Sequence, residues 1–598
     1  MKIVTIDFET YFADDFTLSK MTTEAYLRDA RFEPHGAAIK WGSEHHAKWY
    51  THPELVEGFQ KVDWSQTAVL HHHAAFDAAI LNWHYGVRPR FIFDTLSMAR
   101  HNLGNHISVS LDSVRKRFGI PAKTTPYNLF KNLHWREMPE STRALVASGA
   151  EDEVESIWRI FQLLGKDFPA EEYEVVDTTI RMFTEPCLRA DSALLANIWE
   201  KENTRKKNLL EDLGVNEDDL QSAGRFAELL RAEGVEPETK DGKNGQIYSF
   251  AKTDPFMTLL LEDGDPRISG LAEARLGVKS TFLQTRVEAL GWMASRGSMP
   301  VYLNMYGAHT TRWSGGDGVN WQNLNAAIEN AILPPEGFWA YQIDASQIEC
   351  RILNMVAGQT DKIMEFRDGL DPYVGVASAF AGFPVNKNDH PELRQAGKVV
   401  ELQAGYGSGS AKIKQTLRVK AGIRISDEDA LRYRDAYRET HPKVVDLWSD
   451  AGRMISRLAG GPTLDWGPAR IENGKLYLPN GTWINYTTLE YFRDDEYDDS
   501  YWRLKTRRGW SKIYGAKLVE NFIQALARVV ISQAMTRIKR SGYRIVNTKH
   551  DSMWILLPID GREQEHIRYI ESEMRVEPNW LPGIPLDAEG HLGERFSK

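Results

Sequence analysis

The chain has 598 residues, of which 42% are hydrophobic and 26% are charged, a composition that is ordinary for a soluble globular protein. This length exceeds what one hydrophobic core supports, so we expect three to five structural units. No run of about 18 apolar residues is present, so no membrane span is predicted. The formal net charge of −10 would repel nucleic acid, and any nucleic-acid surface must therefore be local.

The first 165 residues alternate strand-like and helix-like stretches, which predicts an α/β domain. Asp7 and Glu9 directly follow the first strand pattern, and alternation places both on one face of an extended segment. Asp77 follows a second strand, and Asp152 stands at the head of a helix-like run. Four acids in such an arrangement could bind two divalent metals and hydrolyse a phosphodiester.

Residues 166–295 are polar and helical in pattern, and a mixture of strands and helices follows from residue 296. A turn-rich, β-prone stretch interrupts this region at about 460–510. It contains a basic cluster that indicates either a local nucleic-acid surface or a solvated hairpin with paired charges. The cluster consists of Arg503, Lys505, Arg507, Arg508, Lys512 and Lys517.

Two aspartates occupy exposed turns next to predicted strands. Asp344 lies between a strand pattern at 339–343 and a helix pattern that starts at Gln347. Asp551 lies between two strand-like runs, 543–548 and 553–557, and should occupy a hairpin turn. If the strands bring these turns together, the two carboxylates would hold two Mg²⁺ ions roughly 3.5–4 Å apart. The alternative is that each aspartate only caps a strand end.

A basic helix is predicted between the two aspartates. Arg394, Lys398, Leu402 and Tyr406 recur every four residues and therefore share one helical face. Arg394 and Lys398 suit a triphosphate, because charge-assisted contacts stabilise negative charge on phosphoryl oxygens. Tyr406 would lie beside a base, with a following glycine, Gly407, that permits close backbone approach. A solvated basic face is the alternative.

In this order the three blocks resemble motifs A, B and C of family A DNA polymerases, the DNA polymerase I type, and most of all its bacteriophage members. The resemblance implies a multidomain α/β and α+β fold of the right-hand kind. Its thumb would lie within 166–295, its palm in 296–360 and 446–598, and its fingers in 361–445. It also implies template-directed addition of dNMPs to a primer 3′-OH with Mg²⁺, or Mn²⁺, held by Asp344, the Ala345 carbonyl and Asp551.

The resemblance further assigns substrate contacts. The dNTP would meet Arg394, Lys398, Tyr406, Gln347 and Glu349. Glu349 corresponds to the family's steric gate against a ribose 2′-OH, although Ser346 to Glu349 also fits a helix capping box. The residues expected to contact primer and template are Arg312, Gln322, Asn323, Gln524 and His550.

The sequence departs from the family pattern at three places in this region. Leu402 replaces an aromatic residue, which puts sugar selectivity in doubt. Ser552 replaces the glutamate that usually follows the second aspartate, and Ala345 replaces a common tyrosine. We expect polymerase activity to survive these changes.

The N-terminal acids Asp7, Glu9, Asp77 and Asp152 resemble the set of an RNase H-like DEDD 3′→5′ proofreading exonuclease. Members carry a tyrosine four residues before the last acid or a histidine five before it, and Ser148 and Ala147 stand there in this chain. His73 also replaces an asparagine of the second motif. The alternative is an exonuclease site that is weakened or inactive.

A phage replicative role implies primer–template DNA and dNTPs as substrates, a helicase and a single-strand-binding protein as further partners, and a monomer in the cytoplasm of an infected bacterium. The N-terminus enters a strand pattern directly, without the layout of a signal peptide. The alternatives are a repair or gap-filling polymerase, a non-catalytic DNA-end-binding factor, and a nuclease with an inert C-terminal half.

Overall fold

The computed structural model describes residues 1–42, 44–104, 106–242, 245–252, 254–261, 263–280, 282–494, 499–507 and 509–597. The chain forms two compact units. The first consists of Met1–Leu188, Pro300–Leu324 and Pro334–Lys598, and the second of Arg189–Met299 and Asn325–Leu333. Among the described residues, no helix has the length and apolar character needed to cross a membrane.

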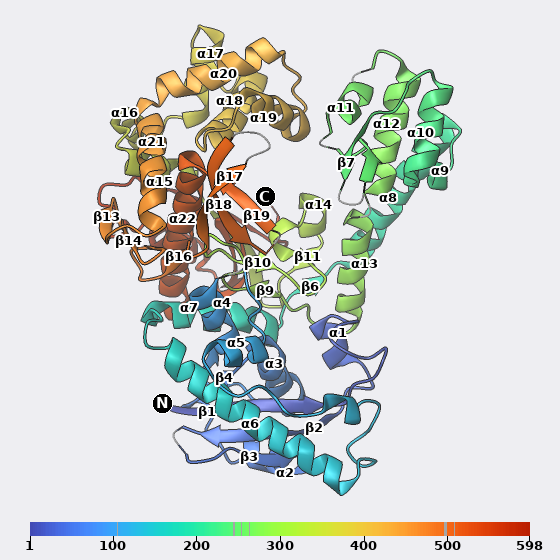
Figure 1. Ribbon diagram of the computed structural model, residues 1–598, viewed down its shortest axis with the longest axis vertical. Helices are drawn as coiled ribbons and strands as arrows, with labels where there is room; N and C mark the ends of the chain where they lie inside the picture. The colour runs from blue at the N-terminus through green and yellow to red at the C-terminus, as the bar shows by residue number, and fades with distance from the viewer. Residues whose placement is uncertain are drawn as a thin grey trace. The chain divides into compact units, whose positions relative to one another are not determined.

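The N-terminal part of the first unit is built on a five-stranded sheet of order β3-β2-β1-β4-β5 (Figure 1). Its strands are β1 (Lys2–Thr10), β2 (Pro34–Trp41), β3 (Lys48–Thr51), β4 (Thr67–His71) and β5 (Phe91–Asp94). β1 is antiparallel to β2 and parallel to β4, and β4 is parallel to β5. The mixed α/β pattern expected for residues 1–165 is present.

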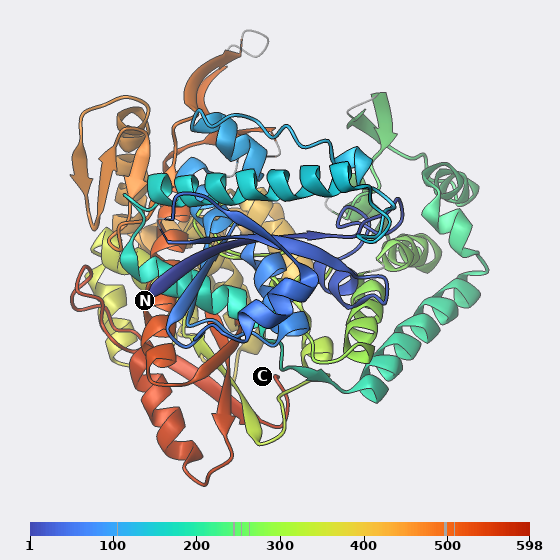
Figure 2. The ribbon, with the colours of Figure 1, turned by 90° about the horizontal axis from the view of Figure 1, so that it is seen from below.

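Helices surround this sheet, and the long helix α6 (Glu140–Leu164) crosses β1 and β2 (Figure 2). The others are α1 (Thr23–Arg28), α2 (His52–Phe59), α3 (Ala74–Tyr85), α4 (Thr95–Leu103), α5 (Leu111–Arg117) and the 3₁₀ turn η1 (Tyr127–Leu129). α6 buries residues spaced three or four apart, as a helix packed on a sheet must. The next helix, α7 (Ala170–Thr184), packs against β5.

A second sheet, of order β20-β21-β12-β22, lies further along the first unit. Its antiparallel strands are β12 (Phe338–Ala345), β20 (Arg544–Lys549), β21 (Ser552–Pro558) and β22 (Ala588–Gly593). The nearby helix α22 (Gly515–Arg540) is buried along most of its length and packs against α7, and α23 (Glu563–Met574) packs beside α22. The short elements β9 (Leu303–Asn304), β10 (Ser314–Gly315) and η2 (Trp321–Asn323) precede β12.

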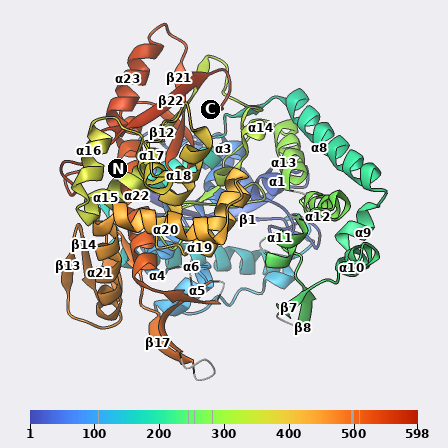
Figure 3. The ribbon, with the colours of Figure 1, turned by 90° about the horizontal axis from the view of Figure 1, so that it is seen from above.

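Helices between β12 and residue 458 group together in the view of Figure 3. They are α15 (Ile348–Ala357), α16 (Thr360–Arg367), α17 (Pro372–Ala381), α18 (Pro391–Ala404), α19 (Ser410–Thr416), the π-helical turn η3 (Leu417–Ala421), α20 (Asp427–Thr440) and α21 (Pro442–Leu458). α15 and α21 both pack against α22, which joins this group to the second sheet.

Two small sheets occupy the stretch predicted to be rich in turns and strands. The first contains β13 (Leu464–Trp466), β14 (Ala469–Glu472), β15 (Lys475–Tyr477) and β16 (Trp483–Asn485). The second contains β17 (Leu489–Asp494), β18 (Asp499–Thr506) and β19 (Gly509–Ile513). The β-rich character predicted for about 460–510 is present.

The second unit is mainly helical. Its helices are α8 (Ser192–Leu213), α9 (Glu217–Gln221), α10 (Ala223–Ala232), α11 (Pro255–Leu261), α12 (Pro266–Lys279), α13 (Phe282–Ser295) and α14 (Ala326–Glu329). Short pairs β6 (Arg189–Ala190) with β11 (Ile332–Leu333) and β7 (Thr239–Gly242) with β8 (Gly245–Tyr248) complete it. Phe226, Leu230 and Phe256 lie in its core. The division of the chain into five named domains stays a prediction.

Candidate active site

The two aspartates lie at neighbouring ends of paired strands. β12 and β21 pair antiparallel, with Asp344 opposite Ser552, and the amide of Ala345 donates to the carbonyl oxygen of Asp551 at 3.0 Å. His550 and Asp551 form the turn between β20 and β21, where His550 has a φ of 56°. The hairpin turn predicted for Asp551 is therefore present, and it lies beside the end of β12.

This pair of carboxylates has the donor chemistry that Mg²⁺ requires. Mg²⁺ prefers oxygen ligands and is usually bound by one or two carboxylates together with substrate phosphates. In the described part of the chain, no group of three or more His, Cys, Asp or Glu residues is arranged to hold a metal by itself. Asp344 and Asp551 thus fit a site that a nucleotide completes.

Arg312 lies close to three other predicted site residues, Gln524, Glu349 and His550. Its Nη2 donates to Oε1 of Gln524 at 2.8 Å, and its Nη1 lies 3.2 Å from Oε1 of Glu349. Burial, followed by the charge of Arg312, lowers the pKa of His550. Segments of the chain that are far apart in sequence therefore converge next to the Asp551 turn.

Glu349 binds side chains and does not cap its helix. The Tyr406 hydroxyl donates to Oε2 of Glu349 at 2.5 Å, and burial, followed by the charge of Glu349, raises the pKa of Tyr406. The N-cap of α15 is Gln347, with a φ of 48° and no side-chain cap bond. The amide of Ser346 instead donates to the carbonyl of Asp587. The capping-box interpretation is therefore wrong.

The predicted basic face of α18 exists. Arg394, Lys398 and Tyr406 are half-buried, and Leu402 is exposed, whereas Val400 on the other side is fully buried. Both cations lie near the ring of Tyr373, and Nε of Arg394 lies 2.5 Å from Oδ2 of Asp371. The face is ordered by these contacts and is not a freely solvated one.

Gly407 packs closely against α22, and its predicted approach to a base stays a prediction. Its φ is +72°, and a Cβ at this position would lie 2.6 Å from Cβ of Ala516. Any larger residue would have to displace the first turn of α22.

Gln322 supports the turn that carries Asp551. It is buried, its Nε2 donates to the carbonyl of Thr548, and its Oε1 accepts from the amide of His550 at 3.1 Å. Nζ of Lys549 also donates to the carbonyl of Leu324. The hydrogen bonds of Gln322 position the turn that carries Asp551. Contact of Gln322 and Asn323 with DNA stays a prediction.

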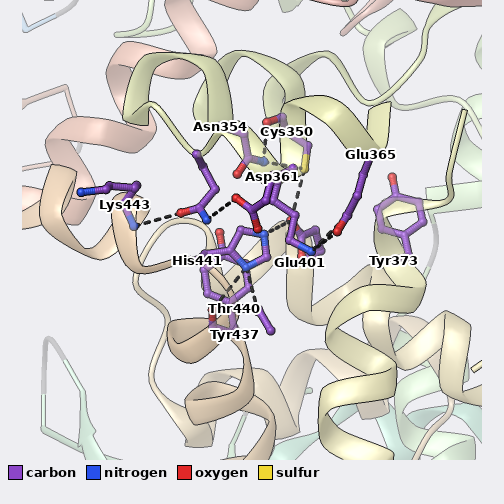
Figure 4. A network of polar contacts seen from close by, with 12 residues as sticks. Cys350, Asn354, Asp361, Glu365, Tyr373, Glu401, Tyr437, Thr440, His441 and Lys443 are labelled. Atoms are coloured by element: carbon purple, nitrogen blue, oxygen red, sulfur yellow. Dashed lines mark hydrogen bonds and ion pairs between the residues drawn. The ribbon is translucent and has the colours of Figure 1, made fainter. Parts of the chain in front are cut away.

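A buried polar network anchors α18 (Figure 4). Oε1 of Glu401 lies 3.3 Å from Sγ of Cys350 and 3.2 Å from Nε2 of His441. The His441 ring stacks on Tyr437 with centroids 4.2 Å apart. Burial, followed by the charge of Glu401, raises the pKa of Cys350. The sequence analysis missed this network, although a glutamate on the apolar side of an amphipathic helix is a usable signal.

A separate cluster of acids lies at the N-terminal sheet. Asp7 and Glu9 are on β1, and Asp77 on α3 accepts the amide of Phe8 at 3.1 Å. Burial raises the pKa of each of these three acids and is the largest contribution to the shift. The negative charge of Glu153 further raises the pKa of Asp7 and of Glu9. The negative charge of Asp7 further raises the pKa of Asp77.

The structure does not bring Asp152 to this cluster. Its side chain is 53% exposed and lies 2.7 Å from Arg115, whereas the adjacent Glu153 is buried and faces the acids. Helix periodicity explains the error, since Glu153 follows the buried Ala150 and precedes the buried Ile157 on the inner face of α6. We therefore correct the fourth acid from Asp152 to Glu153.

A neighbouring segment supplies a lysine and a tyrosine to the same cluster. Nζ of Lys123 lies 2.5 Å from Oε2 of Glu153, and the Tyr127 hydroxyl donates to Oε1. This segment packs on α6 at Gly149, where an added Cβ would lie 2.4 Å from Oγ1 of Thr125. Ser148 is exposed and Ala147 has no polar side-chain atom, so neither position supplies a water-orienting group to the cluster. His73 instead contacts the hydroxyl of Tyr302 at 2.9 Å.

Comparison with known proteins agrees with the geometry of the Asp344 region. The family described as DNA polymerase family A matches residues 193–458, which include Arg312, Asp344, Glu349 and α18. Residues 193–458 belong to DNA polymerase family A. The matched segment ends before the Asp551 turn. The pairing of β21 with β12 places that turn beside Asp344, which lies within the segment.

Curated proteins similar to this chain match over parts of their length. The DNA polymerase of Bacillus phage SP02 is 26% identical over 291 residues, 46% of this chain and 44% of the relative. The thermostable DNA polymerase I of Thermus aquaticus is 29% identical over 305 residues, which are 50% of this chain and 32% of the relative. The matches thus span less than half of these relatives.

A solved structure confirms the fold class of the family A chain. The POL domain of Pol1 from M. smegmatis, in complex with DNA primer-template and dNTP, has a TM-score of 0.69 and 19% sequence identity. The alignment covers 100% of this chain and 95% of that one. The predicted right-hand polymerase fold is therefore confirmed, and the exonuclease assignment of the N-terminal region stays a prediction.

Proposed function

We propose that this protein is a template-directed DNA polymerase that adds dNMPs to a primer 3′-OH. The observation that carries the proposal is the meeting of Asp344 and Asp551 at adjacent strand ends, beside the family A segment. When bound at these carboxylates, two Mg²⁺ ions would lower the pKa of the primer 3′-OH and stabilise the leaving pyrophosphate.

The side chains around the pair suit the remaining tasks. Arg394 and Lys398, on the outer face of α18, neutralise the triphosphate. The proposed role of Glu349 is to exclude a ribose 2′-OH, and the contacts that Tyr406 and Arg312 make with its carboxylate support this role. Arg312 and Gln524 hydrogen-bond to each other and present groups for minor-groove acceptors, which all correct base pairs share.

We also propose a 3′→5′ exonuclease at the N-terminal sheet, built on Asp7, Glu9, Asp77 and Glu153. The observation that favours it is the burial of several carboxylates whose pKa values are raised by burial and by one another. These acids are not arranged in the described residues to hold a metal by themselves. Divalent cations that bind together with a substrate phosphate would neutralise the repulsion among the acids and polarise a phosphodiester. The Tyr127 hydroxyl and the Lys123 ammonium hold Glu153 in place.

The phage relatives favour a role in genome replication over repair or gap filling, with primer–template DNA and dNTPs as substrates in the cytoplasm of an infected bacterium. A helicase and a single-strand-binding protein are the partners that this role requires. We further propose that the protein acts as a monomer.

The test is extension of a labelled primer on a single-stranded template with Mg²⁺ and dNTPs. Asp551→Ala should abolish extension while degradation of a 3′ single-stranded end continues, and Asp7→Ala should do the reverse. Circular dichroism melting of each variant controls for folding. Extension at the wild-type rate by folded Asp551→Ala would overturn the polymerase proposal.

A further inference from the structure

The sheet of β17, β18 and β19 carries cations and aromatic rings on one face. Its register pairs Glu490 with Arg503, Arg503 with Lys512, and Lys505 with Trp510. Alternate residues of a strand point to the same side, so paired positions share a face. The residues of this cation–aromatic face are Glu490, Phe492, Tyr501, Arg503, Lys505, Trp510 and Lys512.

The opposite side of the sheet is buried only in part, since Tyr491 on that side is 61% exposed. Leu504 and Ile513 on that side are 5% and 4% exposed, whereas Trp510 on the cation–aromatic face is 46% exposed and Lys505 is exposed. Arg507, in the turn before β19, is exposed as well. The sheet therefore buries Leu504 and Ile513 and leaves Trp510, Lys505 and Arg507 exposed.

The rings of this face are held in place by its cations. The guanidinium of Arg503 lies 3.6 Å from the Phe492 ring and 4.4 Å from the Trp510 ring. Nζ of Lys512 lies 4.2 Å from the Tyr501 ring. Ordered rings lose little side-chain entropy when a further flat group stacks on them.

Charge on the described part of the face is mainly positive. Glu490 is the acid of the face, and its Oε1 accepts from Nε of Arg503 at 2.6 Å, so that pair is neutral. Lys505, Arg507 and Lys512 add further positive charge. Arg508 and the side chains of the acidic run at 494–499 lie outside the described residues.

Lys505 of the face lies close enough to the loop between α4 and α5 to influence a histidine there. Burial, followed by the charge of Lys505, lowers the pKa of His106, which lies between α4 and α5. Burial, followed by the charges of His106 and then Lys517, lowers the pKa of His309 to about 4. Lys517 is on α22, the helix that carries Gln524.

We propose that the cation–aromatic face binds an unpaired DNA strand, with bases stacked on Trp510 and phosphates paired with Lys505, Arg507 and Lys512. Single-stranded nucleic acid is bound by this combination of a positive surface and exposed rings, because every base has a flat face. Duplex DNA offers no free base for stacking. The choice of DNA as the ligand rests on the proposed polymerase function.

The experiment measures binding of a fluorescent 16-nucleotide oligo-dT by anisotropy, in EDTA and without dNTPs. The variants are Lys505→Glu/Arg507→Glu, Trp510→Ala and Trp510→Phe. The charge-matched control is Lys48→Glu/Lys61→Glu, two exposed lysines of the N-terminal sheet region. Thermal melting of each variant verifies that it is folded.

The first two variants should each weaken binding by about fivefold or more, and Trp510→Phe should stay close to wild type. The slope of log K against log salt should fall by about 0.7 for each phosphate contact removed. The control should match wild type. Equal binding by all variants would overturn the proposal. So would a loss confined to the charge variant, because charge alone attracts any polyanion.

Turnover plays no part in this measurement, so its failure is separate from failure of the polymerase proposal. Normal primer extension with unaltered binding by every variant would refute the surface and leave the polymerase standing. If the wild-type protein extends no primer but the variants bind oligo-dT more weakly than wild type, the result would support the single-strand-binding surface and not the polymerase proposal.

Discussion

The hydroxyl of Tyr406 lies 2.5 Å from Oε2 of Glu349 and joins the end of the α18 region to the first turn of α15. The other oxygen of Glu349 lies 3.2 Å from Arg312, so two donors from separate segments fix this carboxylate. A fixed carboxylate beside the nucleotide site can exclude a sugar hydroxyl by position, which a mobile one cannot.

Glu349→Ala should admit ribonucleotides. Loss of one positioned contact of this kind changes discrimination by about 10–200-fold, so the ratio of kcat/KM for dNTP over rNTP should fall within that range. Tyr406→Phe keeps the ring but removes the hydrogen bond and should give an intermediate ratio. The steric-gate assignment fails if Glu349→Ala rejects rNTPs as strongly as the parent does.

The buried pair Glu172 and Arg528 should be a major contributor to stability. Two hydrogen bonds of 2.6 Å join side chains that are 2% and 1% exposed. Arg528→Met would leave a buried charge without its partner and should cost about 3–5 kcal/mol in the free energy of unfolding.

The exposed pair of Arg540 and Glu174 is the matched control. Arg540→Ala should cost about 1 kcal/mol or less in denaturant titration. An Arg528→Met protein as stable as Arg540→Ala would contradict the role given to the buried pair.

Glu153 and Asp152 should differ sharply in the nuclease assay. Glu153→Gln should reduce degradation of a 3′ single-stranded end by about 100-fold or more, since it removes a carboxylate of the cluster. Asp152→Asn should change the rate by less than about threefold, because its ion pair with Arg115 is half-exposed. The reverse ranking would restore the assignment made from sequence.

Acid should destabilise the protein through buried histidines. Burial lowers the pKa of His101 to about 3 from 6.5. Between those values the unfolded chain binds a proton that the folded protein does not, so stability present above pH 6.5 is lost as the pH falls. The His101 ring packs against Trp483 at an angle of 47°, and both of its ring nitrogens are buried without hydrogen-bond partners.

His101→Phe should remove about 1.4 kcal/mol per pH unit from the slope of unfolding free energy below pH 6. Denaturant titrations at pH 4.5 and pH 7.5 measure it. An unchanged pH slope in the folded variant would show that His101 is protonated equally in both states.

Much of the polymerase site could be predicted because its residues lie in local frames. A strand that ends near Asp344 and a turn at Asp551 follow from hydrophobic alternation, and a four-residue spacing places Arg394 and Lys398 on one helical face. The helix ends at Ala404, so Tyr406 lies in the turn after it and not on that face. The right-hand fold and family membership were correct for the same reason.

Long-range contacts could not be predicted in this way. The bonds of Gln322 to the Thr548–His550 turn and of Glu401 to Cys350 and His441 join segments that no local pattern relates. The choice of Asp152 over Glu153 failed because the two are adjacent, and only the direction of the helix face against β1 separates them.

The central claim is that Asp344 and Asp551 hold the same divalent ions, and oxidative cleavage by bound Fe²⁺ tests it most directly. With ascorbate and peroxide, Fe²⁺ in place of Mg²⁺ should cut the chain near residue 344 and near residue 551. Asp344→Asn should abolish both cuts while cuts near Asp7 and Asp77 persist as a loading control. If Asp344→Asn removes the cut near 344 and leaves the cut near 551 intact, the two aspartates bind separate ions and the account is contradicted.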